Sequence, residues 1–325
     1  MNINTVKKND KQIVTVAVIT YHSAATVLET LDSIVNQSYG AENIELIISD
    51  DGSKDNTIQV INDWLAQHQT KFHSIKFFAN ELNGGISKNC NAAWKAATSE
   101  WIKTIAGDDI LRDNCIADNV EYVTAHKNEN IAVLFSKMQS FKVTKCGLIQ
   151  DLAILPTARA QHFFKLSSLE QFKYLQRQGI SGAPSAFINS DKLSGIGFAD
   201  ERFLMMEDHP LWFKLCQTGY QLKFMDTITV LYRIADSVSN SKSRLINLSY
   251  INEIIAVEEQ LVIPTLNANQ FFLKMRKQLW PKLAIRVASA FDNKVSFLSK
   301  MAIAMVFIIK PAFLTAQLHK VLNKS

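Results

Sequence analysis

Apolar runs and helical patterns alternate along the first 110 residues, and this alternation most constrains the fold of the chain. The runs are rich in β-branched or aromatic residues and occupy 13–19, 44–49, 75–79 and 101–106. Such runs are typical of strands covered on both faces. Apolar residues at helical spacing fill the intervals between them. The pattern predicts an α/β fold with a Rossmann-like, mostly parallel sheet flanked by helices, whose ligands bind beyond the carboxyl ends of the strands.

Acidic motifs follow two of these runs. SDDGSKDNT occupies 49–57, at the end of the second run, and AGDD occupies 106–109, at the end of the fourth. Asp, Gly and Ser are ordinary turn and N-cap residues, so either motif alone is best explained as a structural turn. Because neighbouring parallel strands end at one edge of a sheet, the two motifs together favour a shared site.

Asp108 and Asp109 would repel each other unless a cation compensates, and Mg²⁺ or Mn²⁺ suits their oxygen ligands. Such an ion keeps positions for phosphate oxygens, which favours a nucleotide diphosphate as its companion. The sequence has no GxxxxGK[ST] phosphate loop and no GxGxxG fingerprint. We therefore expect the metal to hold the diphosphate, with Asp51, Thr20 and Tyr21 on the nucleoside side of the cleft.

A second acidic pair lies in the segment 203–233. Pro210 fits the first turn of a helix and Gly219 fits its end, so Glu207 and Asp208 are expected at the helix N-terminus. An Asp one or two residues before such a proline is a good N-cap, worth about 1 kcal/mol. A structural role for Asp208 is therefore one interpretation of this pair.

Five segments occur in a fixed order along the chain: VTVAVITYHSAATVLETLDSIVNQSY, IISDDGSKDNT, NGGISKNCNAAWKAA, EWIKTIAGDDIL and MMEDHPLWFKLCQTGY. In this order they resemble the successive motifs of family 2 glycosyltransferases of the GT-A fold. The resemblance spans residues 13 to about 240. It is closest to the bacterial members that build O-antigen, capsule or other surface polysaccharides.

The resemblance implies an inverting transfer of a sugar from a nucleotide diphosphate donor, usually a UDP-sugar, to a hydroxyl of a glycan or polyprenyl-diphosphate-linked acceptor. By position, Asp51 matches the nucleoside-binding residue, and Asp108 and Asp109 match the metal and donor carboxylates, with Asp109 the direct metal ligand. Asp208, beside Glu207, matches the catalytic base of the "ED" motif. The helix N-terminus would lower the pKa of Asp208, whereas desolvation by the acceptor would offset that effect.

Several positions depart from the family pattern. His22 stands where Asn is frequent, and Cys90 stands where an Arg often follows the "GIS" segment. Lys88 could supply the missing positive charge to the donor phosphates, while Cys90 is better explained as a core residue. Ala235 replaces a His that touches the metal in related enzymes, and Arg233 is a weaker candidate for phosphate binding.

The cysteines and the N-terminus favour the cytoplasm. Cys90, Cys115, Cys146 and Cys216 form no CxxC or Cys/His pair, so the sequence suggests neither a zinc site nor a disulfide framework. The first twelve residues are polar and lack the apolar core of a secretory signal. We expect a cytoplasmic protein, with or without peripheral contact to the inner face of the membrane.

The positive charge is concentrated at the C-terminus. Residues 261–325 hold ten Lys or Arg and one acid, Asp292, a net charge of +9, so the rest of the chain carries −4. The apolar run 301–309 is too short for the roughly 20 residues that span a bilayer. Basic amphipathic helices on an anionic membrane and a basic cap packed on the catalytic domain explain this region equally well. Long apolar stretches among the cations argue against nucleic acid.

The expected organisation is a GT-A catalytic domain over 1–240 and a helical basic region over 241–325. Within the domain, 1–110 forms the nucleotide-binding half and 111–240 the acceptor-side half. A polyprenyl-phosphate sugar synthase and a non-catalytic nucleotide- or glycan-binding module remain as alternatives. No motif in 140–200 identifies the sugar or the acceptor.

Overall fold

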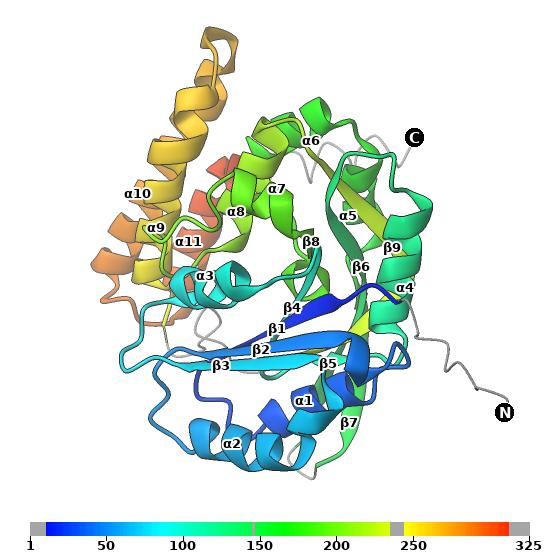
Figure 1. The fold of residues 1–325 in the computed structure, drawn as a ribbon. Coiled ribbons are helices and arrows are strands. Elements are labelled where there is room, and N and C mark those ends of the chain that lie inside the picture. Colours follow the sequence, from blue (N-terminus) through cyan, green and yellow to red (C-terminus); the bar gives the residue numbers. More distant parts are fainter. Residues whose placement is uncertain (1–10, 145–146, 235–243, 312–325) are drawn as a thin grey trace, which may run out of the picture.

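One nine-stranded sheet organises the molecule (Figure 1). The computed structural model describes residues 11–144, 147–234 and 244–311. The strand order is β3-β2-β1-β4-β8-β6-β9-β5, and β7 pairs with β6. The strands are β1 (Val14–Thr20), β2 (Ile44–Asp50), β3 (Ser74–Ala79), β4 (Trp101–Ala106), β5 (Ile110–Leu111), β6 (Ile131–Val143), β7 (Ile149–Leu155), β8 (Phe187–Asn189) and β9 (Gln221–Arg233).

Helices cover this sheet and extend beyond one side of it. They are α1 (Val27–Val35), α2 (Thr57–His68), α3 (Ile86–Ala96), α4 (Cys115–Ala125), α5 (Ala158–Gln161), α6 (Ser168–Leu175), α7 (Ser190–Gly195), α8 (Asp208–Gln217), α9 (Leu248–Val257), α10 (Phe271–Ala290) and α11 (Phe297–Ile309). The predicted alternation of strands and helices in the first 110 residues is confirmed.

The first four strands pair in parallel, as predicted. β1 lies between β2 and β4, and β3 extends the sheet beyond β2. The register places Thr20 opposite Asp50 and Ile19 opposite Ala106. The two acidic motifs therefore lie on either side of the carboxyl end of β1. The later strands are mixed, because β8 runs antiparallel to β4 and β6 whereas β9 runs parallel to β6.

Both faces of the sheet are buried at its central strands β1 and β2, whereas β3 is only partly buried and β7 is exposed. Val14, Val16 and Val18 of β1 pack in one cluster with α1 and α2, whereas Ala17 and Ile19 pack in a second cluster with α3 (Figure 1). Successive side chains of a strand point to opposite faces, so this division follows from the period of two. Burial of each Val or Ile side chain stabilises the folded state by about 1.5–3 kcal/mol. This packing holds the strand ends, and the acidic turns that follow them, in place.

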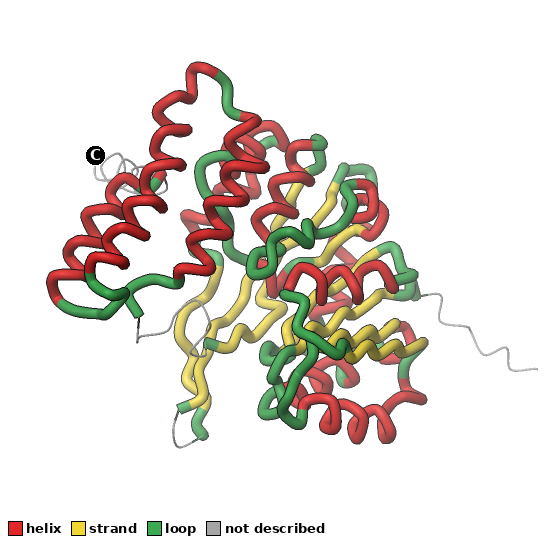
Figure 2. The backbone as a smooth tube through the Cα atoms, turned by 90° about the vertical axis from the view of Figure 1, so that its left-hand side faces the viewer, coloured by secondary structure: helices red, strands yellow, loops and turns green. Residues whose placement is uncertain are grey.

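The C-terminal helices form a group of their own. α9, α10 and α11 stand together at one side of the sheet (Figure 2) and share a third apolar cluster around Trp280. This group also packs on the rest of the chain, since Val257 contacts Phe203 and Met206. Both carboxylate oxygens of Glu253 accept the Met205 N–H at 2.9 Å. The region thus packs as a cap on the segment that precedes α8.

The structure also bears on membrane spanning and on the state of the cysteines. Within the described ranges, every helix is too short or too polar to cross a bilayer. Cys90, Cys115 and Cys216 are buried free thiols. Cys146 and Ala235, both singled out above, lie outside the described residues.

Candidate functional site

The two acidic turns are tied to the end of β1 by backbone hydrogen bonds. The Asp51 N–H donates to the Thr20 carbonyl at 3.0 Å, and the Gly107 N–H donates to the Ile19 carbonyl at 2.9 Å. The Thr26 hydroxyl then donates to the Gly107 carbonyl at 2.8 Å. The structure therefore brings the turns at 50–53 and 107–109 to one edge of the sheet, as their spacing predicted.

Asp51 organises the loop that enters α3. Its side chain is 4% exposed, and its two oxygens accept the N–H groups of Gly84 at 2.7 Å and Gly85 at 3.0 Å. Burial raises the pKa of Asp51, and the two N–H donors partly offset this rise. A carboxylate oxygen has two lone pairs, so each oxygen can accept a further bond from a ligand.

Gly85 joins this loop to the segment before α8. Its φ is +88°, and a Cβ added there would lie 2.7 Å from the Leu204 carbonyl oxygen and 3.0 Å from Leu204 Cα. The Ile86 N–H donates to the same carbonyl at 2.8 Å. Only glycine allows both the conformation and the close approach of the two backbones.

We expect Gly85→Ala to lower the free energy of unfolding by about 2–4 kcal/mol, because it adds a backbone clash to left-handed strain. Gly197→Ala is the matched control, since Gly197 has φ +81° and no heavy atom within 4 Å of its added Cβ. Strain alone should cost about 1–2 kcal/mol there. Urea denaturation measures both values, and equal losses would contradict the proposed contact.

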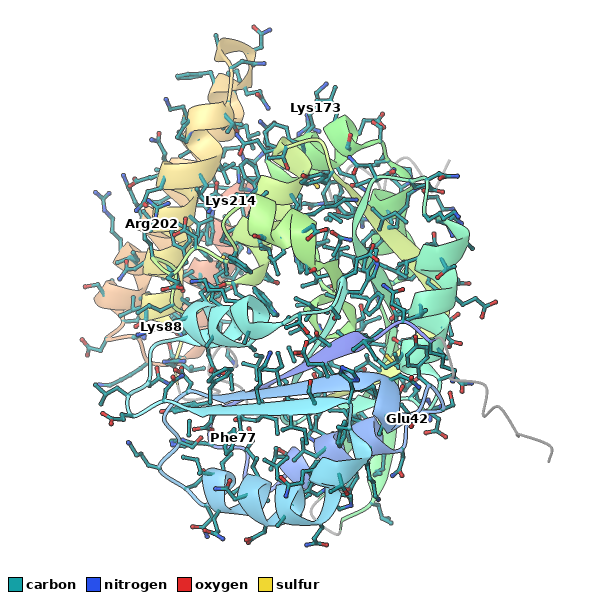
Figure 3. All side chains as sticks on the ribbon, viewed as in Figure 1. Glu42, Phe77, Lys88, Lys173, Arg202 and Lys214 are labelled. Carbon is teal, nitrogen blue, oxygen red and sulfur yellow. The ribbon has the colours of Figure 1, made fainter. Side chains whose placement is uncertain are left out.

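The remaining donor-side candidates differ in exposure. Thr20 is 1% exposed, and its hydroxyl donates to Asp50 Oδ2 at 2.9 Å, so it supports the turn from beneath instead of facing the cleft as expected. Tyr21 is 48% exposed and stacks on His22 with ring centroids 4.1 Å apart. Lys88 projects at the surface from the first turns of α3 (Figure 3). Tyr21 and Lys88 are thus the accessible members of this group.

Arg233 fixes the turn that carries the adjacent aspartates. Its backbone N–H donates to Asp109 Oδ1 at 2.9 Å, and its Nε donates to the Asp108 carbonyl at 2.8 Å. Its Nη2 forms an ion pair with Glu29 at 2.8 Å, and the guanidinium lies over Phe141. The guanidinium considered for phosphate binding is therefore already used to hold β9 against this turn.

The aspartate pair fits a divalent cation. Burial, and then the charge of Asp108, raise the pKa of Asp109 to about 8, and burial also raises the pKa of Asp108. Among the described residues, no three acidic, imidazole or thiol side chains gather into a metal cluster. Mg²⁺ and Mn²⁺ do not need one, because one or two carboxylates plus substrate phosphates suffice. Asp109 and Asp108 are the residues that would hold the ion.

Glu207 and Asp208 lie at the start of α8, as expected, but neither side chain caps it. Glu207 occupies the N-cap position without a side-chain hydrogen bond, and Asp208 is the first helical residue. Asp208 Oδ1 accepts the His209 N–H at 2.6 Å. Burial raises the pKa of Asp208 above its ordinary value, opposite to the expected effect of the helix N-terminus. Burial and Asp208 raise the pKa of Glu207 as well.

The α3 helix connects the donor-side turn with this second acidic pair. Burial, and then the charges of Glu207, Asp51 and Asp208, raise the pKa of the Cys90 thiol. The Ser87 hydroxyl donates to the Phe203 carbonyl, which fastens α3 to the segment before α8. Three predicted site residues therefore surround one helix, and Cys90 is a protonated core thiol.

Sequence reasoning missed three residues near the second acidic pair, namely His209, Tyr250 and Glu253. Tyr250 of α9 lines the same cavity as Asp208 and His209, and Glu253 of α9 raises the pKa of Glu207 after burial and Asp208 have done so. An available signal was the group of polar side chains within 249–253 of the segment LSYINEIIAV at 248–257, Tyr250 and Glu253 among them.

A family model matches the first half of the chain, and solved structures of similar fold cover most of it. Residues 15–163 match the family model described as "Glycosyl transferase family 2". The "Poly(ribitol-phosphate) beta-glucosyltransferase" of Bacillus spizizenii is 26% identical over 60% of this chain and 32% of its own length. The "UDP-Glc:alpha-D-GlcNAc-diphosphoundecaprenol beta-1,3-glucosyltransferase WfaP" of Escherichia coli is 22% identical over 76% of this chain and 88% of its own length.

Other curated relatives are longer proteins, of which the matched segment spans 19% and 40%. The crystal structure of S. aureus TarS 1–349 in complex with UDP-GlcNAc superposes with a TM-score of 0.61 and 19% identity, covering 92% of this chain and 82% of TarS 1–349. This likeness concerns the fold, which is that of GT-A enzymes. The family match accordingly identifies residues 15–163 as a glycosyltransferase family 2 domain.

Proposed function

We propose that this chain is an inverting glycosyltransferase that moves a sugar from a nucleotide diphosphate donor to an acceptor hydroxyl in the synthesis of a cell-surface glycan. The observation that carries the proposal is the convergence of two acidic turns at the end of β1 with a second acidic pair across α3. In this proposal residues 1–240 carry catalysis, with 241–325 as the helical region.

Each residue of the proposed site has one task in the reaction. Asp51 and the exposed ring of Tyr21 bind the nucleoside, and Lys88 faces the donor phosphates. Asp109 and Asp108 would hold a Mn²⁺ or Mg²⁺ ion, which would supply positive charge to stabilise the departing diphosphate. Asp208 accepts the proton of the acceptor hydroxyl as its oxygen attacks the anomeric carbon, and a raised pKa suits that role. Displacement in one step inverts the anomeric configuration.

The relatives support a UDP-sugar donor and a lipid-linked acceptor. WfaP is described as using UDP-Glc and a diphosphoundecaprenol-linked GlcNAc, and TarS 1–349 was crystallised with UDP-GlcNAc. We therefore propose UDP-glucose and UDP-GlcNAc as the first donors to test. Buried free thiols fit the reducing cytoplasm.

A transfer assay tests the proposal. The chain is incubated with Mn²⁺, each UDP-sugar and either a lipid-diphosphate-linked GlcNAc or a ribitol phosphate oligomer, and the product is analysed by NMR. We expect a new glycosidic bond with the anomeric configuration opposite to that of the donor. Retention of configuration would refute the single-displacement mechanism.

We also propose that α10 and α11 contact an anionic membrane. Their exposed apolar side chains recur at helical spacing and are accompanied by exposed cations; they are Phe271, Phe272, Met275, Phe297, Leu298, Met301 and Met305. Such faces bind the headgroup region. Flotation with phosphatidylglycerol liposomes should fall at least tenfold in Phe272→Asp/Phe297→Asp. Flotation that is equal for this variant and the native chain would contradict membrane contact by these helices.

A further inference from the structure

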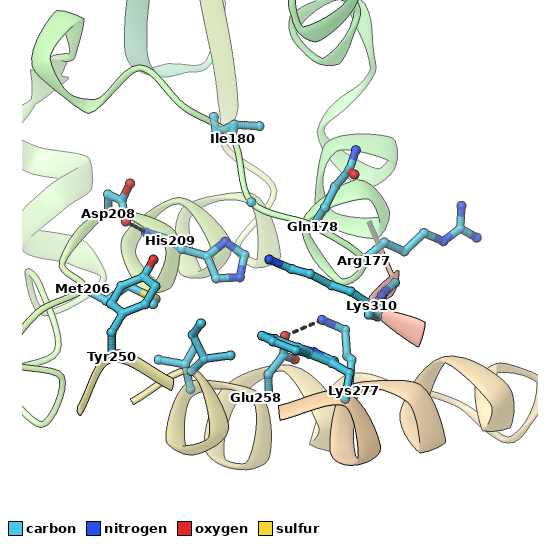
Figure 4. Close-up of a pocket in the computed structure, with 15 residues that line it drawn as sticks. Arg177, Gln178, Ile180, Met206, Asp208, His209, Tyr250, Glu258, Lys277 and Lys310 are labelled. Atoms are coloured by element: carbon cyan, nitrogen blue, oxygen red, sulfur yellow. Dashed lines mark hydrogen bonds and ion pairs between the residues drawn. The ribbon is translucent and has the colours of Figure 1, made fainter. Parts of the chain in front are cut away.

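A cavity of about 330 Å³ lies beside the proposed catalytic base (Figure 4). Asp208 and His209 of α8 form one side of it, and the loop with Arg177 and Gln178 forms another. The C-terminal cap supplies much of the remaining wall, from α9, the turn after it, α10 and the residues that follow α11; among these are Tyr250, Glu258, Lys277, Trp280 and Lys310. The base thus opens onto a space that only the packed C-terminal region completes.

Cations outnumber the acids opposite Asp208 in this cavity. Lys277 forms an ion pair with Glu258 at 2.6 Å, so those two charges offset each other. Arg177 and Lys310 form no ion pair within the described part of the chain. The Lys310 amino group lies 4.9 Å from the centroid of Trp280 and extends toward His209 (Figure 4). Two cations therefore remain to attract an anionic group.

Unsatisfied polar atoms line the same space. His209 Nδ1 and Glu258 Oε2 are buried and have no hydrogen-bond partner among the described residues. Burial, and then the charge of Lys277, lower the pKa of His209 to about 4, so the imidazole is neutral and can donate one hydrogen bond. A buried polar group without a partner costs about 1–3 kcal/mol. A ligand with oxygen acceptors would remove that cost at His209.

We infer that this cavity binds a phosphate group of the acceptor, placing the neighbouring hydroxyl at Asp208. The inference rests on the proposed function and deepens it, because it specifies a phosphate-bearing acceptor and gives the C-terminal cap a share of the acceptor site. Arg177 and Lys310 bind the phosphate oxygens, His209 donates to one of them, and Tyr250 and Met206 border the sugar or polyol.

Two short probes distinguish the source of the phosphate. Geranyl diphosphate represents a polyprenyl diphosphate, and glycerol 3-phosphate represents a polyol phosphate. Each is titrated by calorimetry into the chain saturated with UDP and excess Mg²⁺, so that the donor site is filled. Geraniol and glycerol serve as uncharged controls. We expect at least one phosphate probe to bind while its uncharged control does not, and the tighter probe identifies the source.

Variants then locate the binding site. In Arg177→Gln/Lys310→Gln we expect affinity for the phosphate probe to fall at least tenfold, with UDP affinity within twofold of the native value. Lys294→Gln, at an 80% exposed lysine of the same region, should leave both unchanged. Probe binding that survives the double substitution, or a probe that displaces UDP, would overturn the inference. So would a native chain that binds UDP but neither probe, whereas a native chain that does not bind UDP would refute the proposed function instead.

Discussion

Asp208→Asn should reduce glycosyl transfer by about 10²–10⁴-fold while leaving UDP-sugar binding intact. The amide cannot accept the acceptor proton, yet it retains the size of the side chain at the start of α8. Because burial raises the pKa of Asp208, the native rate should also increase with pH as this group loses its proton. Steady-state kinetics across pH, with the donor affinity measured separately, would check both effects.

Asp191→Asn is a suitable control for that variant. Asp191 lies in the first turn of α7 and is exposed, so its substitution changes charge at a helix start without touching the site. We expect full activity from it. An unimpaired Asp208→Asn variant would instead favour the polyprenyl-phosphate sugar synthase, because a phosphate acceptor is already deprotonated and needs little base catalysis.

Asp109→Asn should weaken UDP binding about 100-fold in the presence of Mn²⁺, to the affinity seen without metal. The variant removes the buried carboxylate that would hold the ion, while the Asn oxygen can still accept the Arg233 N–H. Asp113→Asn is the control, since Asp113 lies four residues further along the chain, is exposed and forms no part of the proposed site. UDP affinity that is the same in Asp109→Asn and the native chain would exclude Asp109 as a metal ligand.

The same variant has a second consequence, for stability. Burial and Asp108 raise the pKa of Asp109 from 3.8 to about 8, so the folded chain retains a proton that the unfolded chain releases. Without metal, the native chain should therefore lose stability as pH rises from about 4 to about 8. Asp109→Asn has no carboxyl group to titrate at this position and should lose less stability over the same pH range. Thermal unfolding at several pH values, with EDTA, measures the difference.

Local sequence patterns predicted the first half of the fold and both acidic turns. Each of the strands β1 to β4 is a short run with its own flanking signals, and the sheet neighbours β1 and β2, like β2 and β3, are joined through one α-helix. The second half could not be predicted in this way. β6 takes β9 as its parallel partner some 90 residues later, and β8 is only three residues long. Such pairings depend on tertiary packing, which periodicity does not report.

The residues of the candidate site likewise divide into those that local sequence predicts and those that depend on tertiary contacts. Asp51, Asp108 and Asp109 follow strands and were found from the turns themselves. The burial of Thr20 and the use of Arg233 inside the protein were not predictable, because both depend on contacts with distant segments. The cavity next to Asp208 was equally hidden, since its lining comes from five segments between 177 and 311. The basic composition of the C-terminus was visible, but the buried pair of Lys277 with Glu258 was not.

Calorimetric titration of the native chain with UDP, GDP and CDP, with and without Mn²⁺, tests the central claim most directly. The claim is that Asp108 and Asp109 hold an ion that in turn holds the diphosphate of a sugar donor. We predict that UDP binds, that Mn²⁺ tightens this binding by about 100-fold, and that GDP and CDP bind more weakly. Absence of binding by all three nucleotides, or binding that is indifferent to Mn²⁺, would show that the aspartate pair is a structural turn and would contradict the account.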